Sequence, residues 1–242
     1  MELSQRVAVI TGASQGLGLA LAHALARRGV AVALVARHPE PLEHAVASIR
    51  AAGGTALAIV ADVGEPQAAL RIAAQVQASL GRPSIVVHNA STLGPVPLQL
   101  LADTDPAAVT QALAVNVVGP FALTRALLGA LVLGDGGVVV HISSDASVEA
   151  YPTWGAYSIG KAALDHLTRI WAAELADTAV RVFAVDPGEM DTKMHADAMP
   201  DADRATLADP AEVAERIVAM ITDERAAPSG ARVVASRGAV AA

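Results

Sequence analysis

The sequence predicts a single α/β domain over residues 1–242, built on a doubly wound parallel sheet of about seven strands with helices on both faces. Two observations support this fold class. Short apolar runs alternate along the chain with longer segments of helical period. The runs are apolar on both faces, which is typical of strands in a parallel sheet covered on both sides. With 53% hydrophobic and 17% charged residues, the chain can bury a full core.

The predicted elements alternate from the first strand to the last. Strands are predicted at 7–10, 31–35, 56–60, 85–88, 138–142, 180–185 and 232–235. Helices are predicted near 17–28, 40–51, 66–80, 106–132, 155–176 and 210–222. The irregular segment from about 188 to 209, with Pro200 and several Asp, interrupts this alternation. Long ordered loops in compact domains are commonly functional, so we expect a substrate flap there.

Composition excludes several classes of function. A formal net charge of -7 without a basic stretch, together with only two Phe, two Tyr and two Trp, argues against a nucleic-acid partner. The chain has no Cys, and its seven His show no ligand spacing, so no metal site is predicted. Every long apolar run is interrupted by charge or Gly, and the first residues lack a signal-peptide layout. We therefore expect a cytoplasmic protein without a membrane partner.

A glycine-rich turn follows the first predicted strand. Its spacing is Gly-x-x-x-Gly-x-Gly, and it opens the first predicted helix; its residues are Gly12, Ser14, Gln15, Gly16, Leu17 and Gly18. Without a Cβ, backbone amides and the positive end of the helix can approach a pyrophosphate closely. Such a turn can also be purely structural, but its place at the first strand-to-helix crossover favours a dinucleotide.

The ends of the second and third predicted strands concern the cofactor's identity. Arg37 stands where an acidic residue would bind a ribose 2′-hydroxyl, and a guanidinium there accommodates a 2′-phosphate. NADP(H) is therefore favoured over NAD(H), although Arg37 could be an ordinary solvated residue. Asp62, followed by Val63, could accept a hydrogen bond from the adenine amino group or could serve only as a turn or capping carboxylate.

Tyr157 and Lys161 place a phenol and an ammonium one helical turn apart. A cation at that spacing lowers a neighbouring phenol's pKa, so the pair is a candidate proton donor for carbonyl chemistry, although such a pair can also lie on a solvated helix face. Asn116 lies in an otherwise apolar predicted helix, where a buried amide must find hydrogen-bond partners.

Together these residues resemble the short-chain dehydrogenase/reductase family over essentially the whole chain. The matches are the glycine turn, Asn89-Ala90 after the fourth predicted strand, Ser144 thirteen residues before Tyr157, Tyr157-x3-Lys161, and Pro187-Gly188. The resemblance implies a Rossmann-like fold that transfers hydride directly between a nicotinamide and a carbonyl or secondary alcohol, without a metal.

The resemblance also implies a role for each matched residue. Tyr157 would be the general acid in reduction, or the base in oxidation. Lys161 would hold the nicotinamide ribose, and Ser144, with Ser143 as the adjacent alternative, would bind the substrate oxygen. Asn116 would anchor a proton-relaying water chain, unless it makes only a structural hydrogen bond. The remaining cofactor contacts would come from Asn89, Ala90, Pro187, Gly188 and Thr192.

The chain departs from the family's usual residues at several positions, among them the ending Ala235-Ser-Arg-Gly238 after the last predicted strand, where the family commonly has Asp-Gly-Gly. His88 and Ser91 flank Asn89-Ala90 where the family has Asn and Gly, which puts cofactor affinity or strand packing there in doubt. Asp186 replaces a common Asn. Because these changes lie away from the reacting atoms, the enzyme interpretation is kept.

The substrate side is predicted to be mainly apolar. Its candidate residues are Tyr151, Trp154, Met190, Met194, His195 and Met199. We expect an NADPH-dependent reductase of a ketone or 3-oxoacyl substrate. The alternatives are a catalytically silent NADPH-binding sensor of the same fold, or a structural subunit. The resemblance further implies a homo-oligomer, a tetramer or else a dimer, built from the helices at 106–132 and 155–176.

Overall fold

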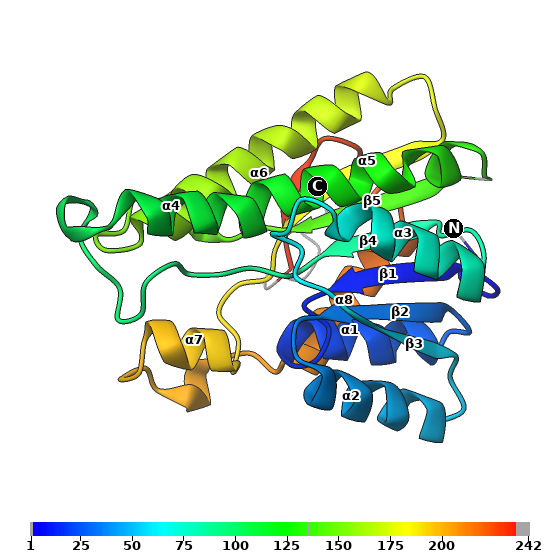
Figure 1. Cartoon of the computed structure of the whole chain (residues 1–242), viewed down its shortest axis with the longest axis horizontal. Helices are drawn as coiled ribbons and strands as arrows, with labels where there is room; N and C mark the ends of the chain where they lie inside the picture. The colour runs from blue at the N-terminus through cyan, green and yellow to red at the C-terminus, as the bar shows by residue number, and fades with distance from the viewer. Residues whose placement is uncertain (1, 135, 236–242) are drawn as a thin grey trace.

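The computed structural model describes residues 2–134 and 136–235. The predicted domain ends, residues 1 and 242, lie outside the described residues. Seven strands form one parallel sheet in the order β3-β2-β1-β4-β5-β6-β7, which confirms the predicted doubly wound fold (Figure 1). The chain crosses from β3 back past β1 to β4, so the carboxyl ends of β1 and β4 meet at the point where the strand order reverses.

The strands lie within a residue or so of their predicted positions. They are β1 Val7–Thr11, β2 Ala31–Ala36, β3 Ala56–Val60, β4 Ile85–His88, β5 Gly137–Ile142, β6 Val180–Asp186 and β7 Arg232–Val234. In β1 the side chains alternate between two cores: Ala8 and Ile10 face one, and Val7 and Val9 the other. This alternation explains why the strands read as continuous apolar runs.

Helices cover both faces of the sheet. One layer consists of α1 (Gly16–Ala26), α2 (Pro39–Ala51) and α8 (Pro210–Thr222), which share the first core. The other consists of α3 (Ala68–Leu80), α5 (Gly119–Val132) and α6 (Gly155–Glu174), which share the second. Figure 1 shows the sheet between these layers and the long α6 lying beside α5.

The predicted helix at 106–132 consists of α4 (Pro106–Leu113), a π-helical turn (Ala114–Val118) and α5. With 27 residues and a mean hydropathy of 1.6 in its most apolar window, it is long and apolar enough to cross a membrane. Its leucines at 123, 127 and 131 are buried in the second core, so it packs as a core helix. The π-helical turn matters for the site because it contains Asn116.

The segment predicted to be irregular contains a short helix, α7 (Lys193–Ala198), and a 3₁₀ turn, Arg204–Thr206. Two backbone hydrogen bonds, Asp191 N to Ala208 O at 3.0 Å and Ala208 N to Glu189 O at 3.1 Å, close its neck. Figure 1 shows α7 standing apart from the sheet and its helical layers.

Candidate active site

A cavity of about 880 Å³ lies beyond the carboxyl ends of the strands, within the size range of ligand pockets. Most of the predicted site residues line it: Gly12, Ser14, Gln15, Gly16, Leu17, Arg37, Asp62, Val63, Asn89, Ala90, Ser144, Tyr157, Lys161, Pro187, Gly188 and Thr192. In the described part of the chain, Gly18 and Asn116 are the two predicted residues that do not line it. Both contact residues that do line it.

The glycine turn is packed against the segment after β4. Gly12 has a φ of +64°, and a Cβ there would lie 2.8 Å from the Cα of Ala90. A Cβ on Gly18 would lie 2.5 Å from Asn89 Nδ2. That amide donates to the carbonyl oxygens of Thr11 and Gly12 at 3.1 and 3.0 Å. Asn89 and Gly18 thus shape the turn from behind.

The first turn of α1 offers free donors to the cavity. Among the described residues, no side chain caps this helix end, and its first turn contains no acidic residue. Gln15, Gly16 and Leu17 line the cavity at this point. Uncapped N–H groups at a helix N-terminus bind anions, so the turn fits the pyrophosphate of a dinucleotide.

Arg37 and Asp62 lie at the same end of the cavity. Arg37 is exposed, and it makes no hydrogen bond or ion pair with any residue in the ranges described. Its guanidinium is therefore free to bind a phosphate. Asp62 accepts a hydrogen bond from Gly64 N at 2.9 Å through Oδ1. It thus has the turn role left open by the sequence, and its second oxygen remains available to a ligand.

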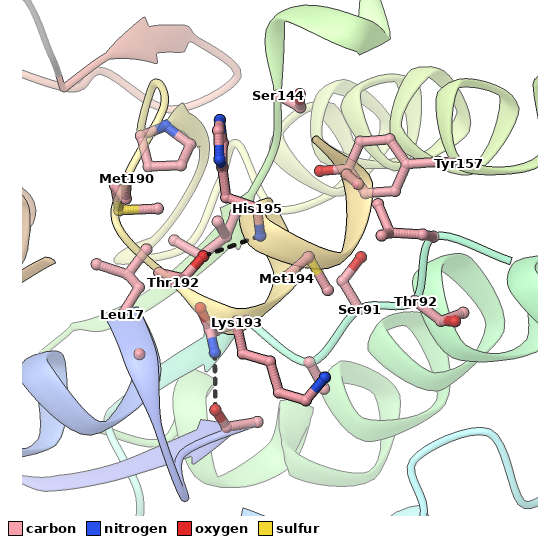
Figure 2. A pocket seen from close by; sticks show the side chains of 18 of the residues that line it. Leu17, Ser91, Thr92, Ser144, Tyr157, Met190, Thr192, Lys193, Met194 and His195 are labelled. Atoms are coloured by element: carbon pink, nitrogen blue, oxygen red, sulfur yellow. Dashed lines mark hydrogen bonds between the residues drawn. The ribbon is translucent and has the colours of Figure 1, made fainter. Parts of the chain in front are cut away.

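Tyr157 and Lys161 project from α6 toward the cavity and the end of β5. Lys161 is 2% exposed, and its Nζ donates to the carbonyl oxygen of Ile142 at 2.6 Å. The same Nζ lies 5.4 Å from the centre of the Tyr157 ring, over its face. Figure 2 shows the Tyr157 hydroxyl directed toward the part of the cavity where Ser144 and His195 lie.

The predicted lowering of the phenol pKa is wrong for the protein alone. Burial raises the pKa of Tyr157 to about 12; the Ser144 hydroxyl partly offsets this, while Asp145 and Asp186 add to it. Burial also lowers the pKa of Lys161 to about 8. Burial is the largest cause of both shifts, because it disfavours the charged form of each group.

Ser144 lies at the end of β5, where its backbone begins a 3₁₀ turn (Asp145–Ser147). Its Oγ donates to Asp145 Oδ1 at 2.9 Å, so it must rotate to donate to a substrate oxygen. The other Asp145 oxygen accepts from the Tyr151 hydroxyl at 2.9 Å. Sequence reasoning missed Asp145, although its place directly after Ser144 was a usable signal.

Asn116 bonds to the segment after β4. Its Oδ1 accepts from Thr92 N at 2.9 Å and Ser91 Oγ at 3.1 Å, and its Nδ2 donates to Thr92 O at 2.9 Å. These bonds give the side chain a structural role, and its part in a proton-relaying water chain stays a prediction. The departure at Ser91 supplies one of these bonds, so its side chain contributes to local packing.

The departure at His88 also has a packing explanation. His88 stacks on His141 of β5 with ring centres 5.0 Å apart. His88 Nε2 pairs with Thr124 Oγ1 and His141 Nδ1 with Thr168 Oγ1, both at 2.8 Å. Burial lowers the pKa of His88 to about 3 and that of His141 well below its usual value. Both rings are therefore neutral near neutral pH.

The β6 end and the following segment form the opposite wall. Gly188 has a φ of +73°, and its N–H donates to Asp186 Oδ1 at 3.0 Å. Thr192 caps α7 by accepting from His195 N at 3.3 Å, as Figure 2 shows. All six predicted substrate-side residues line the cavity, and so do Thr92, Leu93, Glu189 and Lys193, which the sequence did not single out.

A parallel sheet with a glycine-rich turn and a cavity at the reversal of strand order is typical of dinucleotide-binding proteins. A family model for short chain dehydrogenases matches residues 6–203, and the chain belongs to the short-chain dehydrogenase/reductase family. It is 36% identical over 197 residues to a short chain dehydrogenase of Pseudocercospora fijiensis, covering 81% of this chain and 63% of that protein.

Two further comparisons cover nearly the whole chain. The chain is 30% identical over 253 residues to 2-(S)-hydroxypropyl-CoM dehydrogenase 3 of Xanthobacter autotrophicus, covering 99% of this chain and 98% of that protein. A short chain dehydrogenase of Shigella flexneri, solved in complex with NADP, superposes with a TM-score of 0.91 at 28% identity, covering 98% of this chain and 99% of that one.

Proposed function

We propose that this protein is an NADP(H)-dependent reductase of ketones or 3-oxoacyl groups. The observation that carries the proposal is that Tyr157, Ser144 and Lys161 line the same cavity as the uncapped end of α1. A bound nicotinamide supplies the hydride in such chemistry. The residues of this chain would hold the dinucleotide, orient the carbonyl and deliver the proton.

The preference for NADP(H) rests on Arg37. Arg37 lines the cavity, and its guanidinium has no hydrogen-bond or ion-pair partner among residues 2–134 and 136–235. Support also comes from the Shigella flexneri structure, which was solved with NADP. Arg37→Asp would replace an attractive contact to a 2′-phosphate with a repulsive one. The ratio of NADPH to NADH affinity should then fall by roughly tenfold or more; an unchanged ratio would refute the role of Arg37.

Tyr157 would act as the acid. A buried phenol with a pKa of about 12 stays protonated throughout the neutral range, so its proton is present when alkoxide charge develops on the substrate. Ser144 would hydrogen-bond the same oxygen after turning from Asp145. The Lys161 ammonium, fixed by Ile142 O, would hold the ribose and stabilise negative charge on the phenol oxygen.

Apolar packing and acidic groups together restrict the substrate. Leu93, Ala146 and Tyr157 form an apolar cluster, against which Trp154 and Met194 pack. Asp145 and Glu189 add carboxylates to the cavity lining, which disfavours anionic substrates. We therefore propose a neutral apolar ketone or oxoacyl thioester, with the 188–209 segment as its flap.

Tyr157→Phe separates this proposal from the sensor alternative. Phenylalanine keeps the ring packing but removes the proton. Turnover should fall by roughly a hundredfold or more, while NADPH affinity changes little. Retained turnover would eliminate Tyr157 as the acid. A wild-type protein that binds NADPH but reduces no carbonyl would favour the sensor.

We also propose one domain, a cytoplasmic location and a homo-oligomer, a tetramer or else a dimer. Exposed apolar residues on the two long helices support association: Val118, Phe121, Ile159 and Ile170. Light scattering of Phe121→Lys against wild type tests it, because a buried charge at a subunit interface would dissociate the assembly.

A further inference from the structure

Arg232, on the edge strand β7, joins segments that lie far apart in the sequence. Its Nη2 donates to the Ser144 carbonyl oxygen and to Asp186 Oδ2, each at 2.9 Å. Its Nε donates to Ser147 Oγ at 3.2 Å and lies 3.2 Å from Asp165 Oδ2. The Asp165 contact is an ion pair without hydrogen-bond geometry, because the Nε–H is directed at Ser147.

Each of these contacts reaches a segment that carries a site residue. Ser144 itself lies at the end of β5. Asp186 precedes Pro187-Gly188 and accepts the Gly188 N–H through its other oxygen. Asp165 follows Lys161 by one turn of α6. A planar guanidinium has several donors in fixed directions, so it can hold such groups at set positions where a lysine offers only a point charge.

We propose that Arg232 is a positioning residue for the reaction: it fixes the Ser144 backbone and the Asp186 turn relative to Lys161, and so aligns the carbonyl-binding hydroxyl with the nicotinamide site. The inference rests on the proposed function for its effect on turnover. Its effect on the lysine's charge does not depend on turnover.

The electrostatic consequence follows from the charges that face Lys161. Asp165 and Asp186 act to raise the pKa of Lys161, against the larger effect of burial. The side chains of both carboxylates are only 8% exposed, and Arg232 pairs with each. The other facing groups are His141, which is neutral, and Tyr157. Removing the guanidinium leaves the carboxylates uncompensated, so Lys161 should titrate at higher pH.

Lysine NMR can detect this shift in the protein alone. The chain has two lysines, Lys161 and Lys193, and Lys193 is exposed and paired with Asp197. With carbon-labelled lysine, the wild-type Lys161 signal should titrate near pH 8. In Arg232→Met its midpoint should move to higher pH, and kcat should fall by roughly tenfold to a hundredfold through misalignment.

Arg181→Met is the matched control. Arg181 is a buried arginine on the neighbouring strand β6, and its guanidinium donates to the backbone oxygens of Met220, Ile221 and Ala227. This variant should lose stability, while the Lys161 midpoint and kcat remain those of wild type. A general loss of packing would change both variants alike.

Arg232→Lys keeps the proposal testable if the Met variant does not fold. It retains the charge, so the Lys161 midpoint should stay near the wild-type value. The kcat should still fall, because one ammonium cannot reproduce the directed hydrogen bonds of the guanidinium. A folded Arg232→Met with wild-type Lys161 midpoint and kcat would overturn the proposal, and so would an unchanged kcat in Arg232→Lys. If the wild type binds NADPH but reduces no carbonyl, the proposed function fails, while the NMR comparison still decides the role of Arg232.

Discussion

The two walls of the cavity are held in different ways. The glycine-turn wall, formed by the turn after β1 and the segment after β4, is fixed by backbone contacts: Asn89 bonds to two carbonyl oxygens, and Gly12 and Gly18 leave no room for a Cβ. The flap wall, residues 188–209, is joined at its neck by two backbone bonds. Within this described segment, α7 has no buried residue.

Because the two walls are held differently, we expect one to determine cofactor binding and the other to determine substrate choice. The glycine-turn wall cannot accept larger side chains without moving backbone, so its shape is set by the fold. The flap wall contributes exposed or half-buried side chains, among them Met194 and Met199, which can change without disturbing the sheet. Substrate choice is therefore expected to depend on the flap wall, and cofactor binding on the glycine-turn wall.

The largest predicted effect concerns the strands beneath the glycine-turn wall. His88 and His141 have folded-state pKa values below the unfolded value near 6.5, so the unfolded chain binds more protons below that pH. The stability is fully present above pH 6.5 and is lost as the pH falls below that value, for His88 until the pH reaches about 3. The loss should approach roughly 1.4 kcal/mol per pH unit for each histidine.

Acid unfolding of wild type and His88→Asn, followed by circular dichroism, measures this effect. Asparagine can still bond to Thr124 but takes up no proton, so the variant should unfold at lower pH. An identical midpoint would show that these strands do not limit acid stability.

Next in size is the effect of Gly18→Ala. The added methyl would press on Asn89 and on the Gly12 carbonyl, costing about 1–3 kcal/mol of stability and weakening NADPH binding. Gly129→Ala is the control: it lies on exposed α5 surface with no heavy atom within 4 Å of the added Cβ, and should gain up to about 1 kcal/mol. Denaturant unfolding and NADPH titration compare them. Wild-type affinity in Gly18→Ala would contradict the rigid glycine-turn wall.

A third prediction concerns Lys161, which lies between the walls. Its pKa of about 8 means that the ammonium is lost as the pH rises above that value, whereas Tyr157 keeps its proton until about 12. The kcat for reduction should therefore fall by roughly tenfold per pH unit above the Lys161 pKa. A kcat–pH profile that stays flat to pH 10 would mean that the reaction does not need the ammonium.

The smallest effect is expected on the flap wall. Arg204 binds both Asp191 oxygens at 2.9 Å, but its side chain is 74% exposed. Arg204→Ala should change stability by less than about 1 kcal/mol and leave NADPH affinity unchanged, while KM for the carbonyl substrate rises. Loss of NADPH binding in this variant would contradict the expectation that cofactor binding depends on the glycine-turn wall and not on the flap wall.

The sequence predicted best those features that follow from a local pattern of residue types, namely the strands and the glycine turn. The strands 56–60 and 85–88 match β3 and β4: β4 is buried throughout, so all its positions but one must be apolar, and the edge strand β3 keeps an apolar run although it is only partly buried. The glycine turn was equally readable, since a positive φ and close approach exclude other residues. The six-residue helix α7 was missed because so short a helix depends on its Thr192 cap and on tertiary contacts.

Side-chain environments were harder to predict. The Tyr157–Lys161 spacing suggested a lowered phenol pKa, but burial depends on how distant segments cover α6. The partners of Asn116 lie in the segment after β4, and those of Arg232 lie in the segment after β5, on β6 and on α6. Such contacts exist only once the sheet has formed, so no local sequence pattern predicts them.

One measurement tests the central claim most directly. Trp154 lines the cavity, whereas Trp171 packs in the core against Phe121, so a Trp171→Phe protein reports ligand binding through Trp154 fluorescence. NADPH is titrated first, and a panel of ketones and oxoacyl thioesters is then added while NADPH absorbance is followed. We predict quenching by NADPH, and then NADPH oxidation with at least one apolar carbonyl. Quenching without oxidation by any carbonyl would contradict the reductase, and no quenching would contradict the cofactor site itself.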